Sequence, residues 1–381
     1  MTGLGRARLA VIAVFAANGA MFGNWAVRIP AVKAHLDLSD ASLGAALLVP
    51  ALGALISMPL TGALSARVGS RTATAAAGLL FVLVPVLLGL APSLPWLVPA
   101  LFVFGLAFGG LDVAMNAQAV SVERAMGRPV MSSFHAAFSA GAMIGSLTGA
   151  AGAALGLSVA AHLGLVGLVL LAVCAPLLPS MLRQEPSVEP AGPLFAWPRG
   201  RLVPLAAIAL VVLLAEGAVA DWSAVHLRQD LSAAPGIAGL AFTAFSLTMV
   251  CGRLAGDRVV AAAGRARTVL WSALAAAAGG VAVVLAPSVG VAVAGFAALG
   301  VGLACVVPLV FVAAAGDDPH PGPALAAVST PGYVGFLIGP PLIGGLAELV
   351  GLGTALALLP LLLLGVALLA GRTAPAPALS T

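Results

Sequence analysis

The chain has 381 residues, of which 61% are hydrophobic and only 8% are charged. Soluble globular domains carry roughly 25% charged residues, so this composition excludes a water-facing fold and leaves no room for a separate soluble catalytic domain. The net charge of +4 comes from scattered arginines and one lysine, without the basic stripe of a nucleic-acid-binding surface, so no nucleic-acid partner is expected.

Apolar runs long enough to cross a bilayer, which takes about 20 residues, recur along the whole chain. In the first half they predict helices at 8–34, 40–65, 72–91, 96–119, 131–154 and 158–180. In the second half they predict helices at 203–227, 236–256, 267–286, 289–314, 324–348 and 352–371. The expected fold class is an all-α membrane protein of twelve transmembrane helices.

These helices group into two halves of six, residues 1–180 and 203–372. Residues 181–202, rich in Pro and polar side chains, are the expected linker, and residues 373–381 are a tail. The three cysteines lie inside apolar runs and the histidines lie apart from them, so neither a disulfide framework nor a metal site is predicted.

The basic residues predict the orientation, because Arg and Lys are retained on the cytoplasmic side. With the first helix starting inside, fourteen fall on the cytoplasmic side: Arg6, Arg8, Arg67, Arg71, Arg124, Arg128, Arg183, Arg199, Arg201, Arg253, Arg258, Arg265, Arg267 and Arg372. Three fall outside: Arg28, Lys33 and Arg228. This bias predicts a multi-pass protein of the cytoplasmic membrane with both termini in the cytoplasm.

An internal repeat appears at an offset of 195 to 197 residues. Asn24-Trp25 corresponds to Asp221-Trp222 at 197, and further glycine pairs correspond at 195: Gly44 and Gly239, Gly69 and Gly264, Gly105 and Gly300, Gly149 and Gly344, Gly156 and Gly351. Six helices separate equivalent points, so both copies enter the membrane in the same direction. The tryptophan pair is interpreted as interfacial anchoring near the periplasmic side.

The connection between helices 2 and 3, Gly62 to Arg71 with Arg67 and Gly69, resembles the cytoplasmic loop signature of the major facilitator superfamily. Ala66 stands where the signature has an acid. The counterpart predicted between helices 8 and 9 contains Arg253, Asp257 and Arg258 and keeps the acid. The resemblance implies a gating role for Arg67, Gly69, Arg71, Arg253, Asp257 and Arg258, with Asp257 pairing with a nearby arginine.

Four segments resemble an inner-membrane branch of that superfamily related to the proton-coupled fucose permease: 24–30, 111–116, 216–222 and 330–341. That permease has an essential helix 4 acid followed four residues later by an asparagine. These positions correspond to Asp112 and Asn116. The permease's second acid, in helix 1, falls on Ala26 and is absent here.

Two acids inside apolar helices are the candidate proton carriers. A carboxylate at the bilayer centre costs about 2.5–3.5 kcal/mol on insertion scales, so it persists where it faces a polar cavity or a partner. Asp112 and Glu216 meet this description. A purely structural bond between helices is the alternative for both. His135, one turn inside helix 5, is either a proton relay or a helix cap.

The candidate substrate contacts are Asn18, Trp25, Asn116 and Tyr333. Asn18 and Trp25 are seven residues apart and share a helix face, which suits a polar ring, although Asn18 is equally compatible with helix packing. Tyr333 follows Pro331-Gly332, where a broken helix would expose backbone groups to a cavity. Small-residue stretches such as Gly141 to Gly149 are attributed to close helix approach.

Together these features predict a monomeric secondary active transporter that moves a small polar, sugar-like solute by alternating access and is driven by protons. No cofactor is expected, since no phosphate-binding Gly-rich motif ending in Gly-Lys-Ser/Thr is present. Efflux of drugs or metabolites by antiport is the alternative within transporters. An integral-membrane enzyme is the alternative of another class, for which no paired catalytic groups are found.

Overall fold

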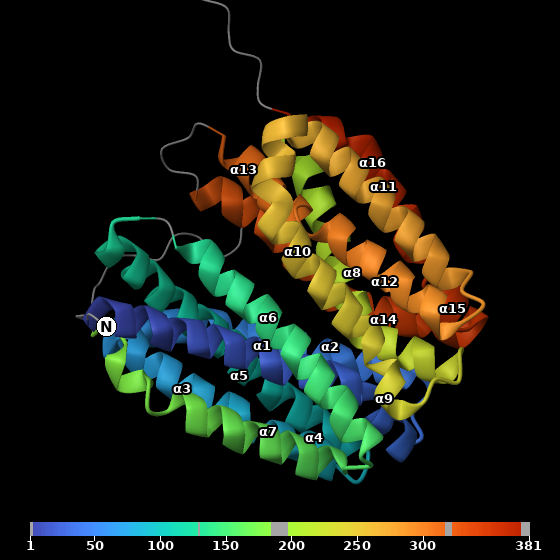
Figure 1. Cartoon of the computed structure of the whole chain (residues 1–381), viewed down its shortest axis with the longest axis horizontal. Coiled ribbons are helices and arrows are strands. Elements are labelled where there is room, and N and C mark those ends of the chain that lie inside the picture. The colour runs from blue at the N-terminus through green and yellow to red at the C-terminus, as the bar shows by residue number, and fades with distance from the viewer. Residues whose placement is uncertain (1–2, 129, 184–196, 317–321, 375–381) are drawn as a thin grey trace, which may run out of the picture. The chain divides into compact units, whose positions relative to one another are not determined.

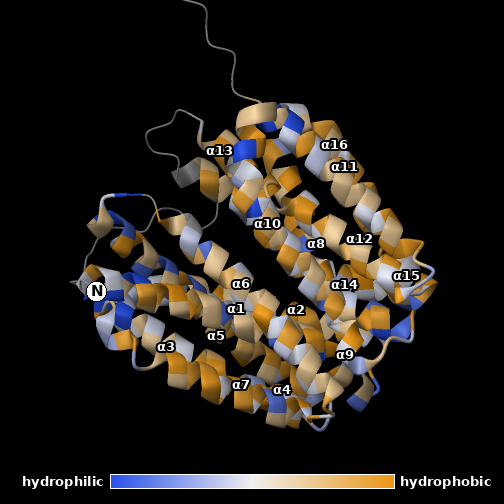
Figure 2. Cartoon of the chain, viewed as in Figure 1, coloured by the Kyte–Doolittle hydropathy of each residue, from blue (hydrophilic) through white to orange (hydrophobic). Residues whose placement is uncertain are grey.

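The structure is a computed structural model that describes residues 3–128, 130–183, 197–316 and 322–374. These residues form helices and connections, and no strand occurs among them. Twelve helical segments are long and apolar enough to cross a membrane. Hydrophobic residues cover most of each helix, and the hydrophilic ones gather mainly at helix ends and connections (Figure 2). The predicted fold class is confirmed.

Packing divides the chain into two compact units, 1–190 with 232–243, and 191–231 with 244–381. The main boundary falls inside the predicted linker. Residues 232–243, which contain α9 and the start of α10, group with the first unit. Helices of the first unit are α1 (Gly3–His35), α2 (Asp40–Val68), α3 (Ser70–Leu83), α4 (Pro85–Leu90), α5 (Leu94–Met126), α6 (Met131–Ala154), α7 (Val159–Cys174), η1 (Leu178–Ser180) and the short α9 (Pro235–Ala238) (Figure 1).

Helices of the second unit are α8 (Leu202–Gln229), most of α10 (Leu240–Ala263), α11 (Arg265–Val284), α12 (Val289–Leu303), α13 (Val306–Ala315), α14 (Gly322–Val350), α15 (Leu352–Ala355), α16 (Leu358–Leu369) and η2 (Ala370–Thr373). Several spans consist of two consecutive helices. In the first unit α3 and α4 form one span, divided at Val84 just before Pro85, a residue without a backbone N–H for the helix ladder.

The repeat is visible in the packing of each unit. A Cβ on Gly105 of α5 would lie 1.9 Å from the backbone oxygen of Pro50 on α2, and a Cβ on Gly300 of α12 would lie 2.3 Å from that of Phe245 on α10. Both members of the second pair are 195 residues beyond those of the first. The two halves therefore repeat a helix crossing in the same register, at a distance that only glycine permits.

The connections repeat as well. Gly69 and Gly264 adopt φ +82° and +79°, and Gly156 and Gly351 adopt φ +68° and +81°. Positive φ is strained for residues with a Cβ, so each glycine is required by its turn. The 195-residue offset read from glycine positions thus corresponds to equivalent turns and contacts.

Small residues also allow α1 and α6 to approach closely, as expected. A Cβ on Gly141 would lie 2.0 Å from the backbone oxygen of Ala16, and one on Gly145 would lie 2.0 Å from that of Ala20. From the other side, a Cβ on Gly19 would lie 2.0 Å from the oxygen of Phe138. The helices interlock through backbone contact, which makes this stretch a packing element.

Two predicted helix ends were too early. The helix predicted at 96–119 corresponds to α5, which continues to Met126. The helix predicted at 236–256 corresponds to α9 and α10, and α10 continues to Ala263. Apolar runs measure the thickness of the hydrocarbon core, whereas a helix extends beyond it until a turn residue ends it. These turn residues are Gly127, with φ +61°, and Gly264.

Candidate functional site

The acid of the first unit lies on α5 and is paired with an amide. Asn116 donates from Nδ2 to the backbone oxygen of Asp112 at 2.8 Å and to its carboxylate Oδ1 at 3.2 Å. Both side chains are half-buried. The expected pairing of the two residues on one helix face is confirmed, and the described residues give Asp112 no cationic partner. The pair combines an ionisable group with a neutral hydrogen-bond donor on the same helix.

The acid of the second unit has a different environment. Glu216 lies near the middle of α8, half-buried, and Arg253 of α10 is close enough to act on it electrostatically. Arg253 was expected only in gating, near the cytoplasmic end of its helix. Its influence on a mid-helix acid could not be read from positions 37 residues apart in the sequence.

Asn18 and Trp25 are packed inside the first unit. Asn18 has no exposed surface, and its Nδ2 lies 3.5 Å from Met115 Sδ, while Oδ1 has no partner among the described residues. Trp25 is 4% exposed, and its ring centroid lies 6.1 Å from that of Phe104 on α5. Trp25 is enclosed by packing within the first unit, whereas Asn18, although it has no exposed surface, lines an internal pocket of that unit.

The interpretation of the two tryptophans as interfacial anchors was wrong. Trp25 is 4% exposed and Trp222 has no exposed surface. Asn24, beside Trp25, donates from Nδ2 to the backbone oxygen of Ala20 and accepts from Thr148 Oγ1 at 3.1 Å on α6. The repeated pair therefore marks a packing position of the first helix of each half.

Tyr333 lies on α14 and its side chain is 46% exposed. The helix runs from Gly322 to Val350 through Pro331, so the break expected there is absent. The helix packs closely on α8 beyond that point, because a Cβ on Gly335 would lie 2.2 Å from the backbone oxygen of Leu210. Tyr333 thus projects from an intact helix.

The residues predicted for gating occupy helix ends. Arg67 is exposed in the last turn of α2, Gly69 is the buried turn residue whose N–H donates to Ser65 O at 2.9 Å, and Arg71 is half-buried at the start of α3. These three lie together in one connection, as expected.

The corresponding prediction in the second half needs a correction. Residues 252–258 are not a connection but part of α10, and the connection itself is Gly264. Arg258 is exposed and Arg253 is half-buried, while the side chain of Asp257 lies outside the described residues. The segment was misplaced because its charges resemble a loop, although they lie on a helix that extends past the apolar run.

His135 is exposed on α6, and its ring meets that of Phe15 edge-on at 5.4 Å. This contact lies in the first unit. The position of His135 is compatible with both roles considered for it, a proton relay and a helix cap.

Two buried polar residues were missed. Arg28 had been counted only among the charges on the outer side, yet it is 3% exposed and donates from Nη2 to Leu157 O at 2.5 Å. Gln118 of α5 has no exposed surface and donates from Nε2 to Ser70 Oγ at 2.8 Å and to Leu182 O at 2.9 Å. The apolar residues around Arg28 are the only feature of the sequence that could have indicated its burial. Nothing in the sequence indicates that Gln118 is buried.

Comparison with known proteins identifies the fold. Residues 10–222 match the family model of the Major Facilitator Superfamily. An uncharacterised transporter of this type from Yersinia pestis is 40% identical over 345 residues, covering 90% of this chain and 89% of that protein. The membrane protein MosC of Rhizobium meliloti is 36% identical over 349 residues, covering 91% and 85%.

Solved transporters share the architecture at low sequence identity. A bacterial homologue of the human lysosomal transporter Spinster, solved in an inward-facing state, superposes with a TM-score of 0.75 at 15% identity and covers 96% of this chain and 95% of that one. The nucleoside transporter NupG gives 0.74 at 12%, covering 98% and 99%. The relatives and the fold are those of transporters, not enzymes, and this chain belongs to the major facilitator superfamily.

Proposed function

We propose that the protein is a proton-coupled permease of the cytoplasmic membrane that carries a small polar, sugar-like solute by alternating access, and that Asp112 carries the proton. The Asp112–Asn116 pair is the observation that supports this. A carboxylate inside a membrane-spanning helix that is held by a neutral amide can gain or lose a proton without breaking an ion pair. The resemblance of the same two residues to the fucose permease's helix 4 motif points in the same direction.

Glu216 is the alternative proton carrier. Its charge is partly balanced by Arg253, so protonating it would leave a cation in the membrane-spanning part of the second unit. Leaving one charge of a buried pair without its partner is strongly destabilising. For this reason we assign the coupling step to Asp112 and a charge-balancing role to Glu216, with His135 as a peripheral relay.

The solute class is proposed from two polar side chains, one in each unit. Asn116 and Tyr333 offer an amide and a phenol for hydroxyl groups, and Tyr333 is 46% exposed. A solute rich in hydroxyls, such as a sugar, matches such donors and acceptors. That a structural neighbour is a nucleoside transporter is compatible with this class. We leave Asn18 and Trp25 out of the proposed solute site because both are buried inside the first unit, Trp25 in its packing and Asn18 at a mostly apolar pocket.

Gating is assigned to the ends of α2 and α10. Arg67, Gly69 and Arg71 form the connection in the first half, and Arg253, Asp257 and Arg258 lie on the last turns of α10. We place both regions, the linker and both termini in the cytoplasm, because fourteen of the seventeen basic residues fall on that side. A topology reporter fused after Arg201 tests the orientation: activity restricted to the periplasm would reverse it.

The test of coupling is sugar uptake into proteoliposomes with and without an inward proton gradient. Asp112→Asn keeps shape and hydrogen-bonding capacity but removes the ionisable group. We expect the variant to lose gradient-driven accumulation, by roughly 100-fold if proton transfer is essential, while it still binds solute and exchanges it at a rate independent of pH.

Glu216→Gln is the matched control and should retain accumulation. If folded Asp112→Asn accumulates solute like the wild type and Glu216→Gln does not, the coupling role belongs to Glu216. A wild type that accumulates solute equally without a proton gradient would end the proposal of proton coupling altogether.

A further inference from the structure

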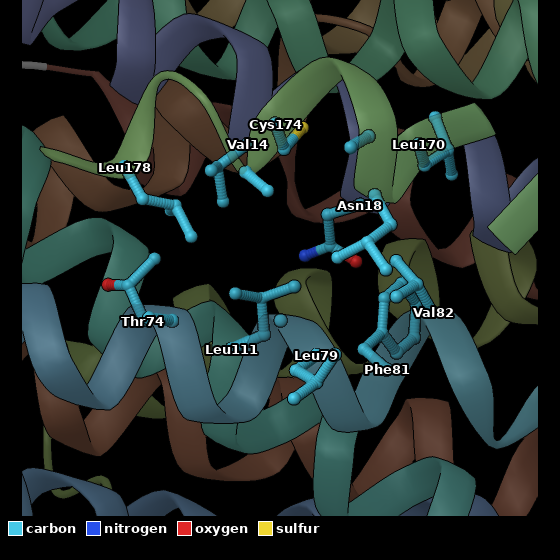
Figure 3. Close-up of a pocket in the computed structure, with 15 residues that line it drawn as sticks. Val14, Asn18, Thr74, Leu79, Phe81, Val82, Leu111, Leu170, Cys174 and Leu178 are labelled. Carbon is cyan, nitrogen blue, oxygen red and sulfur yellow. The ribbon is translucent and has the colours of Figure 1, made fainter. Parts of the chain in front are cut away.

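A pocket of about 240 Å³ lies within the first unit, between α1, α3, α5 and α7. Its walls are mostly apolar, with Phe81, Leu111, Leu170 and Leu178 among them, and Asn18 and Thr74 are the polar residues that line it (Figure 3). Asn18 Nδ2 lies 3.5 Å from Met115 Sδ, and its Oδ1 has no partner among the described residues. The hydroxyl of Thr74 is already bonded to Ser70 O at 2.8 Å. An apolar cavity of about 150 Å³ is sufficient to bind benzene, so this one has room for several methylene groups.

The pocket opens toward the lipid-facing side of the unit. Leu79, one of its lining residues, is 47% exposed. Further large apolar side chains on α3 and α7 are exposed beside it: Leu80, Leu83, Leu165, Leu168, Val169 and Val173. Exposed apolar side chains on membrane-spanning helices contact acyl chains. The natural occupant of an apolar crevice at this depth is therefore hydrocarbon.

Two arginines follow residues that are held together beyond one end of the pocket. Gln118 Nε2 bonds both Ser70 Oγ and Leu182 O, so a single nitrogen holds the start of α3 beside the end of the η1 segment. Arg71 and Arg183 are the next residues in the chain after these two anchors. Arg71 is also one helical turn from the lining residue Thr74.

Neither arginine forms an ion pair with another residue that the structure describes. Arg183 is exposed and Arg71 is half-buried. In the loop signature that this connection resembles, an acid precedes Arg67, but here the position is Ala66. The region beyond this end of the pocket therefore has positive charge with no acid of its own at that position.

From the apolar pocket and the two arginines beside it we infer that the first unit binds an anionic phospholipid. One acyl chain would fill the pocket between α3 and α7, and the phosphate would lie at Arg71 and Arg183. Basic pockets between membrane helices are typical sites for anionic headgroups. In the proposed orientation this site faces the cytoplasmic leaflet, and it is separate from the Asp112–Asn116 pair.

The test is native mass spectrometry of the purified full-length protein with dioleoyl phosphatidylglycerol, dioleoyl phosphatidylcholine or glycerol 3-phosphate. We expect the anionic lipid to be retained in preference to the zwitterionic one, and glycerol 3-phosphate to be bound weakly because it has no chain. Each basic residue near an anionic membrane surface contributes about five-fold to affinity, so Arg71→Gln with Arg183→Gln should weaken phosphatidylglycerol binding by roughly 30-fold.

Gly78→Leu tests the chain pocket without removing charge. A Cβ on Gly78 would touch only Leu111 Cδ1, at 3.7 Å, so the longer side chain extends into open space and the helix gains a better helix former. This variant should fold, as judged by its elution and melting temperature, and should lose phosphatidylglycerol retention.

The matched control is Arg265→Gln with Arg267→Gln, which removes the same charge near the equivalent connection of the second unit. It should leave retention unchanged. Equal loss in the control, equal retention of phosphatidylcholine, binding of glycerol 3-phosphate as tight as that of the lipid, or an unaffected Gly78→Leu would each overturn the assignment.

Discussion

The two units repeat the same helix crossings but treat their buried acids differently. In the first unit Asp112 is held by Asn116 on its own helix. In the second, Glu216 is influenced by Arg253 on a neighbouring helix. A neutral amide adds no charge beside a carboxylate, whereas a nearby cation partly offsets the negative charge. Internal duplication therefore preserved the scaffold while the chemistry of the halves diverged.

The largest loss of stability is expected from substitutions at the helix crossing that both units share. Gly105→Val and Gly300→Val would each press a side chain into the backbone of the facing helix, at Pro50 and Phe245. Overpacking of this kind costs about 1–3 kcal/mol, and more where backbone must move. Both variants should lose most folded, monodisperse protein in size-exclusion chromatography.

Gly62→Ala is the control, because nothing lies within 4 Å of a Cβ built there. It should match or slightly exceed the wild type in melting temperature. If Gly105→Val folds normally while Gly300→Val does not, the close crossing is required in only one half, and the equivalence of the two units at this contact fails.

The difference between the acids is sharpened by a double-mutant cycle on Glu216→Gln and Arg253→Gln. Removing either charge alone leaves the other without compensation. The double variant should therefore lose less free energy of unfolding than the sum of the losses of the two single variants. A coupling energy of about 0.5–3 kcal/mol is expected for interacting residues, measured from unfolding of purified protein.

An additive cycle would mean that Arg253 does not act on Glu216, and the contrast with Asp112 would disappear. The same cycle on Glu216→Gln and Arg267→Gln, a basic residue of the second unit that is not among the groups acting on Glu216, supplies the reference and should be additive within about 0.5 kcal/mol.

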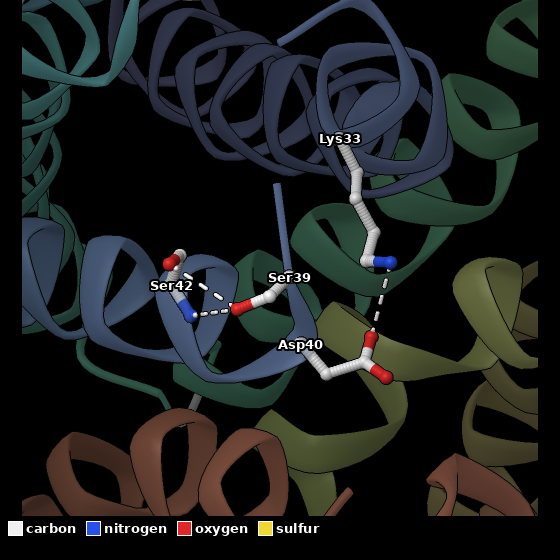
Figure 4. A network of polar contacts seen from close by, with 4 residues as sticks. All are labelled: Lys33, Ser39, Asp40 and Ser42. Atoms are coloured by element: carbon white, nitrogen blue, oxygen red, sulfur yellow. Dashed lines mark hydrogen bonds and ion pairs between the residues drawn. The ribbon is translucent and has the colours of Figure 1, made fainter. Parts of the chain in front are cut away.

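The smallest expected effect concerns the ion pairs at the ends of the first helix of each half. In the first unit Lys33 Nζ lies 3.2 Å from Asp40 Oδ1, across the turn that Ser39 caps through its bond to Ser42 (Figure 4). In the second unit His226 Nδ1 lies 2.6 Å from Asp230 Oδ2 on the same helix end.

Lys33→Gln should reduce stability by at most about 1 kcal/mol, since partly exposed pairs contribute little, and high salt should remove the difference. Thermal unfolding at low and high ionic strength measures it. His226→Gln, at the matched contact of the second unit, is the comparison variant. A loss of stability in Lys33→Gln that persists at high salt would contradict the prediction.

The sequence alone determined the twelve spans and their division into two repeated halves. Apolar length sets the number of crossings because the bilayer requires about 20 such residues for each, and the offset of 195 residues is a property of the chain. The Asp112–Asn116 pair was also predictable, since residues four apart on one helix share a face whatever surrounds them.

Tertiary structure decided what the polar residues face. Asn18, Trp25 and Trp222 could not be placed from sequence, because a helix apolar on all sides gives no signal of which face packs and which meets lipid or a cavity. Proximity of Arg253 to Glu216, and of Gln118 to both Ser70 and Leu182, depends on how separate helices cross. Such contacts between distant segments are set by packing, which the periodicity of a single helix does not encode.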